Sequence, residues 1–169
     1  MLTRFRMDVL SETVADAVAH VGGLMCDRSL TGWDVGVFAA HETGRELSLR
    51  ILGASRTVTL SPDPATHPLL RSIIVSDSLY RTDEKIRRWV GEAMSAPAVE
   101  VLAWDAGRPN ARLVEVPVSR ATRVFLDQAR TAAGLDSASV TSELFCQWKP
   151  GRMSRAPQRQ NILTTANGG

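Results

Sequence analysis

The stretch TDEKIRRWVGEAMSAPAVEVLAW, residues 82–104, contains the best-defined helix of the sequence, followed by a strand. Thr82 is a suitable N-cap, and Pro97 stops the helix. The apolar residues between them recur at the spacing of one helix face: Ile86, Trp89, Val90, Ala93 and Met94. Residues 99–104 are apolar on both faces apart from Glu100, which predicts a central strand.

A similar order of elements precedes this stretch. A helix is predicted from Asp8 to Asp27, because apolar residues recur there three and four positions apart. Two strands are predicted at Trp33–Ala40 and Arg45–Leu52, joined by a hairpin loop at residues 41–44. Leucine and isoleucine alternate with polar residues in the second of these strands, which is the pattern of a strand with one face in water.

The remaining predicted elements do not follow this repeated order of helix and two strands. A short strand at Thr57–Leu60 precedes a crossing at residues 61–68, where three prolines exclude helix and interior strand. Leu69–Tyr80 favours a helix, with a short buried strand as the alternative. Arg112–Val118 is predicted as an edge strand because it contains a proline, and Ser119–Ala133 as a helix that ends at a glycine.

Together these elements predict an α/β (α+β) protein. The simplest packing is a two-layer sandwich, with helices on one face of a mixed or mostly antiparallel sheet of about five strands. A doubly wound parallel sheet is less favoured, because hairpin-like strand pairs outnumber strand–helix–strand crossovers. Residues 1–146 form the predicted single domain, with Ser142–Trp148 as one more short element at its end. Residues 147–169 form a basic C-terminal tail, which we expect to be flexible.

Composition is that of an ordinary globular domain. The chain has 169 residues, of which 44% are hydrophobic and 22% charged. Neither a signal peptide nor an apolar run long enough for a membrane span is recognisable, so we expect a cytoplasmic protein without membrane contact. The basic residues are arginines apart from Lys85 and Lys149, a bias typical of high-GC bacterial genomes.

No sequence motif predicts a cofactor or a metal. The glycine patterns of dinucleotide and phosphate loops are missing, and no group of cysteine and histidine residues has metal-ligand spacing. Asp16 and His20 lie four positions apart on the first predicted helix and can therefore touch. Cys26 would point to a different face of that helix, so we interpret the first two residues as an exposed pair rather than part of a catalytic relay.

One charge asymmetry stands out. The net charge is +2, and no acidic residue follows Glu143, so the four basic residues after it leave a net charge of −2 on the rest. An aromatic residue beside spaced cations can stack on bases or bind a partner. The predicted partner-binding residues are Trp148, Lys149, Arg152, Arg155 and Arg159.

The main functional hypothesis is therefore a non-enzymatic cytoplasmic interaction or regulatory domain that binds a macromolecular partner. The partner would be an unidentified protein or a second copy of the chain, with weak nucleic-acid binding through the tail as a special case. The alternative hypothesis is a small-molecule-binding protein or enzyme with a pocket between helices and sheet. Its candidate residues are His41, Trp104 and Asp105, of which Asp105 stands at a strand end, where sites are often built.

Several short segments carry a resemblance to other proteins. They are GGLMCDR (22–28), GWDV (32–35), RILGA (50–54), SLY (78–80) and DEKIR (83–87). In these segments the chain resembles small actinobacterial proteins that are known only as uncharacterised, over most of residues 8–133. The resemblance implies no activity, and no functional residue is carried over from it.

Overall fold

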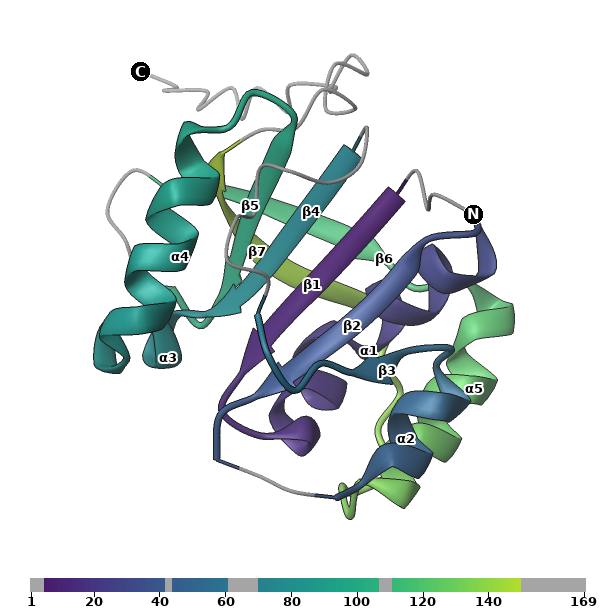
Figure 1. Ribbon diagram of the computed structural model, residues 1–169. Coiled ribbons are helices and arrows are strands. Elements are labelled where there is room, and N and C mark those ends of the chain that lie inside the picture. Colours follow the sequence, from purple (N-terminus) through teal and green to yellow (C-terminus); the bar gives the residue numbers. More distant parts are fainter. Residues whose placement is uncertain (1–4, 42–43, 61–69, 107–110, 150–169) are drawn as a thin grey trace, which may run out of the picture.

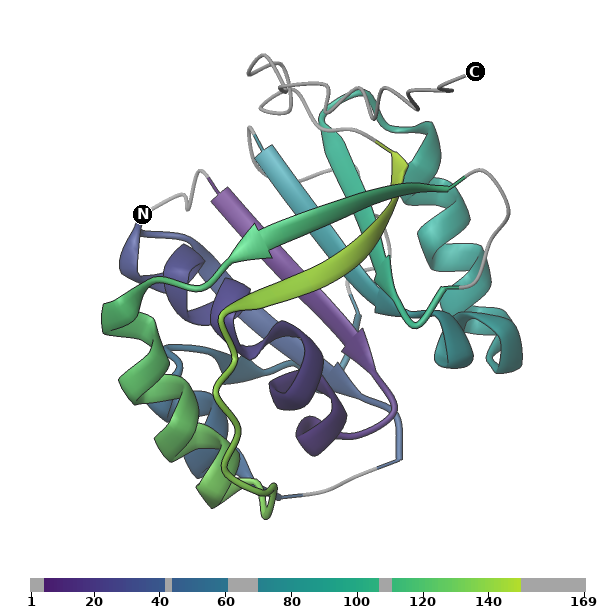
Figure 2. The same cartoon turned by 180° about the vertical axis from the view of Figure 1, so that it is seen from behind.

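Within the residues that the structure describes, seven strands form one sheet with helices on both faces (Figures 1 and 2). The computed structural model describes residues 5–41, 44–60, 70–106 and 111–149. The strands are β1 (Phe5–Ser11), β2 (Asp34–Ala39), β3 (Ser55–Arg56), β4 (Leu70–Ser76), β5 (Val99–Trp104), β6 (Arg112–Pro117) and β7 (Ser142–Lys149). The helices are α1 (Val14–Leu30), α2 (Glu46–Ile51), α3 (Asp77–Thr82), α4 (Glu84–Ser95) and α5 (Arg120–Ala132).

The sheet is mixed, with the strand order β3-β2-β1-β4-β5-β7-β6. The first five strands in this order are parallel, whereas β7 pairs antiparallel with β5 and β6 pairs antiparallel with β7. The predicted α/β class and mixed sheet are confirmed, although the sheet has seven strands rather than about five. Its larger part is the doubly wound parallel arrangement that the sequence disfavoured, because strand–helix crossovers rather than hairpins connect the first strands.

Two hydrophobic cores lie on opposite faces of the sheet. The first is covered by α1, α2 and α5, and the second by α3 and α4. β1 contributes to both, since Val9 belongs to the first core and Leu10 to the second, and both are fully buried. Successive side chains of a strand point to opposite faces, so a central strand needs apolar residues at both parities. The prediction that helices cover only one face was therefore wrong.

The predicted helix Asp8–Asp27 contains two elements. Residues up to Ser11 form β1, and α1 begins at Val14, with the Thr13 hydroxyl accepting a hydrogen bond from the Asp16 amide. Asp8 is buried in β1 and accepts hydrogen bonds from Arg71 at 2.8 Å and from Arg6 at 3.0 Å. A paired carboxylate can occupy a buried strand, and the sequence alone does not reveal this long-range pairing.

Arg45–Leu52 was wrongly predicted as a strand. It contains α2, in which Leu49 is buried while Leu47 is 62% exposed, so the alternating residues do not share one buried face. Leu69–Tyr80 also differs from the favoured helix, because β4 occupies most of it, as the alternative proposed, and α3 follows. β3 lies at Ser55–Arg56, just before the strand predicted at Thr57–Leu60.

The elements around the opening stretch are confirmed. α4 and β5 lie where the sequence predicted them, although the N-cap of α4 is Asp83, whose carboxylate accepts from two backbone amides. Ser119 caps α5 by accepting a hydrogen bond from the Thr122 amide, and Gly134 adopts a positive φ of 75° after its end. β6 is an edge strand, as the position of Pro117 indicated.

The predicted start of the tail at Gln147 lies inside β7, which continues to Lys149. Arg152, Arg155 and Arg159 lie outside the described residues, as does the proline-rich crossing at residues 61–68. Within the described ranges, no helix is both long and apolar enough to span a membrane.

Gly22 and Gly23 lie within α1 where it packs against neighbouring elements. A Cβ atom on Gly22 would lie 2.5 Å from the Leu126 Cδ1 atom of α5. A Cβ atom on Gly23 would lie 2.6 Å from Val118 Cγ2 and 3.1 Å from the Glu143 Oε1 atom. The two glycines are therefore required by close packing, which explains why a helix interior contains them.

Substitution of Gly23 by alanine should lower the free energy of unfolding by about 1–3 kcal/mol, because the added methyl group overpacks the contact with Val118. Gly91→Ala in α4 is the matched control, since no atom lies within 4 Å of its added Cβ. That variant should gain about 0.5–1 kcal/mol from the higher helix propensity of alanine. Urea denaturation measures both values, and equal stability of the two variants would contradict the packing argument.

Candidate functional site

Three parallel strands end at the same level of the sheet. In the β1–β4–β5 register, Leu10 pairs with Val75, and Ser76 pairs with Trp104. Segments that follow these strands therefore meet at one edge. In open α/β sheets, ligands bind outside the carboxyl ends of the strands. α1, which follows β1, and Asp105, which follows β5, both reach this edge.

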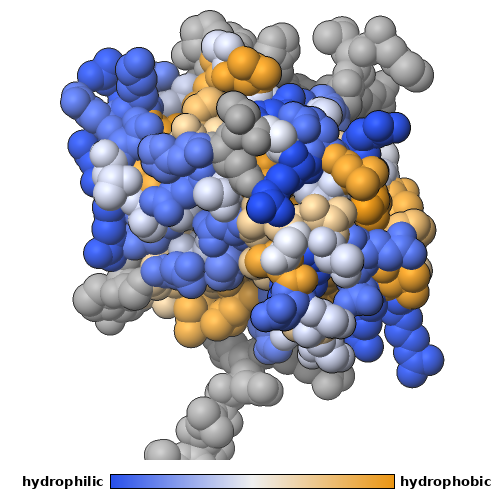
Figure 3. Space-filling view, turned by 90° about the horizontal axis from the view of Figure 1, so that it is seen from below, coloured by the Kyte–Doolittle hydropathy of each residue, from blue (hydrophilic) through white to orange (hydrophobic). Residues whose placement is uncertain are grey.

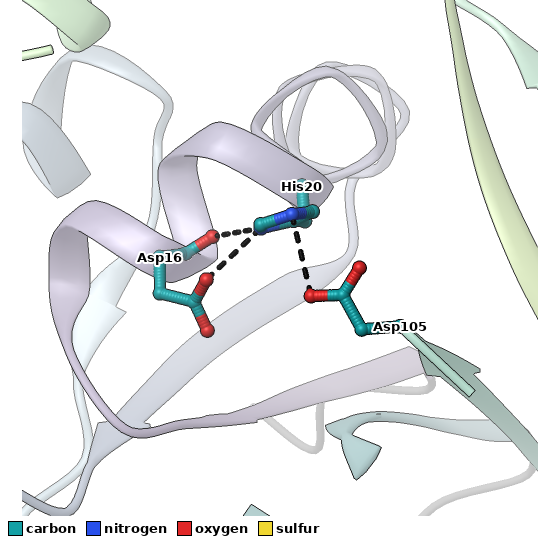
Figure 4. A group of neighbouring side chains, drawn as sticks. All are labelled: Asp16, His20 and Asp105. Carbon is teal, nitrogen blue, oxygen red and sulfur yellow. Dashed lines mark hydrogen bonds and ion pairs between the residues drawn. The ribbon is translucent and has the colours of Figure 1, made fainter. Parts of the chain in front are cut away.

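A histidine lies there between two carboxylates (Figure 4). The Nδ1 atom of His20 lies 3.0 Å from the Asp16 Oδ1 atom and 3.0 Å from the Asp16 carbonyl oxygen. Its Nε2 atom lies 3.6 Å from the Asp105 Oδ2 atom. One ligand atom from each of the three residues lies within 4.8 Å of the others. We call Asp16, His20 and Asp105 the acidic–histidine cluster.

The backbone and an aromatic ring fix two members of this cluster. Asp105 has a φ of 57°, in the left-handed backbone region that residues other than glycine rarely adopt. Such conformations cost free energy and are concentrated at functional sites. The indole of Trp104, which is buried, stacks on the His20 imidazole with ring centroids 5.9 Å apart.

The cluster shifts the ionisation of its own groups. The hydrogen bond from Asp16 raises the pKa of His20 to about 9, against an opposing effect of burial, and the charge of Asp105 adds to the increase. Burial alone would raise the pKa of Asp16, but its hydrogen bond and charge interaction with His20 outweigh burial and lower that pKa. The imidazole therefore carries a proton at neutral pH when no cation replaces that proton.

A pocket of about 420 Å³ opens beside the cluster. Its wall comes from α1, from the end of β5 and from β7, and is mainly apolar. The titratable side chains in this wall are His20, Asp105, Glu143 and Cys146. Pockets of this size hold small molecules, and a few convergent polar groups in an apolar wall are typical of such sites.

Glu143 is the buried acid of this wall. It is 5% exposed and accepts hydrogen bonds from the backbone amides of Gly23 at 2.9 Å and Leu24 at 2.7 Å. Burial raises the pKa of its carboxyl to about 7, although the two amide hydrogen bonds act in the opposite direction.

Two of the three predicted pocket residues, Trp104 and Asp105, lie in the pocket wall. His41 does not line it: this residue is exposed after β2, and its amide donates to the Glu12 carbonyl oxygen at 2.9 Å. The predicted partner-binding residue Trp148 lies in β7 and packs edge-on against Tyr80, with ring centroids 4.7 Å apart.

The sequence interpretation did not assign His20 or Glu143 to the pocket. Asp16 and His20 were recognised as a contacting pair, but the approach of Asp105 depends on the sheet topology. Glu143 had no sequence signal, since its amide partners are about 120 residues away along the chain. Cys26 is buried in the first core and does not line the pocket, in agreement with its rejection as a relay member.

Comparison with known proteins identifies the fold. No family model matches the chain, and no curated protein matches it. A solved deacetylase–teicoplanin complex of teicoplanin biosynthesis is 12% identical, with a TM-score of 0.55 over 84% of this chain and 97% of that chain. The A40926 pseudoaglycone deacetylase Dbv21 is 14% identical, with a TM-score of 0.55 over 85% and 97% of the two chains.

A third similar structure is that of a hydratase rather than a deacetylase. The 4-carboxy-2-hydroxymuconate hydratase GalB from Pseudomonas putida KT2440 is 12% identical, with a TM-score of 0.50 over 86% of this chain and 97% of that chain. At these identities the likeness shows a shared fold. These neighbours are enzymes, which contradicts the prediction of a non-enzymatic macromolecular interaction domain and favours the alternative of a small-molecule pocket.

Titration of His20 tests the electrostatics of the cluster. In protein without added metal, the imidazole protons followed by NMR should titrate with a midpoint of about 9. Because the folded-state pKa is raised, the stabilising effect of this interaction is complete below the unfolded pKa of about 6.5 and is lost as pH rises through 9. Asp16→Asn should lower the midpoint strongly, and Asp105→Asn should lower it less. A wild-type midpoint near 6.5 would contradict the described geometry.

Proposed function

We propose that this chain is an enzyme that hydrolyses an amide or ester bond of an acylated small molecule bound in the pocket. A divalent metal ion held by His20 and Asp105 would assist the reaction. One observation carries the proposal: His20 Nε2 and Asp105 Oδ2 lie 3.6 Å apart in the wall of a 420 Å³ pocket. The deacetylases among the proteins that share this fold support acyl hydrolysis as the reaction class.

The residues of the cluster fit a cation such as Zn²⁺. Bonds from zinc to imidazole nitrogen and carboxylate oxygen are about 2.0–2.2 Å long, so one ion can contact two atoms that are 3.6 Å apart. Asp16 holds the other ring nitrogen of His20, which is the usual arrangement of a metal-bound histidine. Two carboxylates around one imidazole also leave a net negative charge, even when the imidazole is protonated.

The number of donors sets the expected affinity. Catalytic zinc sites usually have three protein ligands, whereas Asp16 is engaged with Nδ1 of His20 and leaves His20 and Asp105 as the direct donors. We therefore expect weaker binding than at a three-ligand site, with open positions for water and substrate. A bound divalent ion polarises a carbonyl group and lowers the pKa of bound water.

The protein side chains supply binding and orientation. Asp16 fixes the ring plane and tautomer of His20, and the Trp104 indole supports the ring from its stacked face. The apolar part of the wall, which includes Leu113 and Leu144, would contact the part of the substrate that does not react.

Direct metal binding tests the site. Isothermal titration with Zn²⁺ should show one ion per chain, and Asp105→Asn or His20→Gln should weaken binding at least tenfold (~1.4 kcal/mol) by removing a direct donor. Asparagine tolerates the left-handed backbone of position 105 better than most residues, so this variant should fold. His41→Gln is the control, because His41 is exposed and does not line the pocket. Equal binding by all four proteins would place any bound zinc elsewhere.

Acyl hydrolysis is tested with a panel of N-acetylated and O-acetylated small molecules, with released acetate as the readout. Activity should be restored by Zn²⁺ after chelation and should fall at least 100-fold in Asp105→Asn and His20→Gln. Unchanged activity in these variants would reject the cluster as the active site.

A further inference from the structure

Two features of α1 are not used by the proposed reaction. The helix contains the consecutive glycines Gly22 and Gly23, and next to them the buried carboxylate of Glu143 bonds two helix amides. Amides inside an α-helix normally donate to the carbonyl four residues earlier. Free amides that bond a carboxylate are instead typical of the first turn of a helix. The Gly23 and Leu24 amides of α1 thus donate to a side chain outside the helix, as amides at a helix start do.

Figure 4 shows the corresponding change of direction. The ribbon of α1 runs sideways through Asp16 and His20, and beyond His20 it continues viewed along its axis. The change of direction therefore lies beyond His20, between the part of α1 that carries Asp16 and His20 and the part that continues to Leu30. The direction of the first part determines where the imidazole points.

Glu143 contacts the bend from a different element. It lies in β7, whose neighbour β5 leads directly to Asp105. The carboxylate thus ties the strand layer that positions Asp105 to the helix that positions His20. The ionised form of Glu143 is also favourable beside two backbone amides that point toward it. The absence of a side chain on Gly23 leaves room for this contact, because a Cβ atom there would lie 3.1 Å from the Glu143 Oε1 atom.

We propose that Glu143 is a positioning residue, which holds the bend of α1 and thereby keeps His20 facing Asp105. Two hydrogen bonds from consecutive amides fix the carboxylate at both oxygens, at 2.9 and 2.7 Å. Loss of either bond lets the first part of α1 rotate relative to β5, which separates the two proposed metal donors. The role of His20 as a donor rests on the proposed function, but its orientation does not.

Glu143→Gln is the closest variant, because glutamine has the same shape but only one acceptor oxygen. Its amide nitrogen cannot accept from the second backbone amide. Glu115→Gln is the matched control on the neighbouring strand, where Glu115 is exposed and accepts from the Ser142 hydroxyl. The readouts are the His20 ring-proton shifts, which depend on stacking with Trp104, and the Zn²⁺ affinity.

In Glu143→Gln we expect the His20 ring-proton shifts to move toward those of an unstacked histidine, and Zn²⁺ affinity to fall about 5- to 10-fold. Glu115→Gln should change neither readout. A folded Glu143→Gln protein with wild-type His20 shifts would overturn the proposal. If wild-type protein binds no zinc while the shifts change as expected, the proposed function fails and the positioning role stands.

A measurement on the wild-type protein covers the case in which Glu143→Gln does not fold. NMR couplings across hydrogen bonds should connect the Gly23 and Leu24 amides to the Glu143 carboxyl carbon. Their absence would overturn the proposal, and their presence together with nuclear Overhauser contacts between His20 and Trp104 would support it.

Discussion

Parallel pairing of β1, β4 and β5 is the constraint on which the rest of the structure depends. Because Leu10, Val75 and Ala103 lie at one level, the three strands end together. This common end lets α1 leave β1 close to the point where Asp105 leaves β5. The buried pair of Asp8 and Arg71 links β1 to β4 within the same layer. A shift of one residue in this register would move the cluster apart and reverse the facing of the core side chains.

The pocket and the acidic–histidine cluster beside it combine groups that arrive from three separate parts of the chain. α1 contributes Asp16 and His20, the end of β5 contributes Asp105, and β7 contributes Glu143. His20 lies between the carboxylates of Asp16 and Asp105, and Glu143 lies in the same pocket wall as His20. On the face seen in Figure 3, hydrophobic side chains form separate groups between hydrophilic ones. The pocket is therefore the place where shape, charge and backbone strain coincide.

Local signals in the sequence predicted those elements whose partners are close in the chain. α4, β5 and α5 have clear periodicity and caps, and all three were predicted correctly. α2 was mistaken for a strand, because alternating apolar residues over one and a half turns fit both structures. The last residues of β1 were predicted as the start of a helix. Asp8 argued against a buried strand there, because the sequence does not show that Arg71, some sixty positions away, pairs with it. The spacing of apolar residues along the chain does not reveal such a long-range ion pair.

Only part of the candidate site could be predicted from the sequence. The four-residue spacing of Asp16 and His20 indicated a contact, and the position of Asp105 after a strand indicated a site. Asp16, His20 and Asp105 come together only because β1, β4 and β5 are neighbours in the sheet. The sequence instead indicated strands joined by hairpins, so this strand order was not predicted. Glu143 could be found only from the fold, since its hydrogen-bond partners are backbone amides about 120 residues away along the chain.

The central claim is that His20 and Asp105 are held as a pair of donors facing one pocket. Anomalous diffraction from crystals soaked in Zn²⁺ tests it most directly. The account predicts one anomalous peak within bonding distance of both His20 Nε2 and Asp105 Oδ2, with Asp16 still bonded to Nδ1. A peak bound elsewhere, or an empty site with His20 turned away from Asp105, would contradict it.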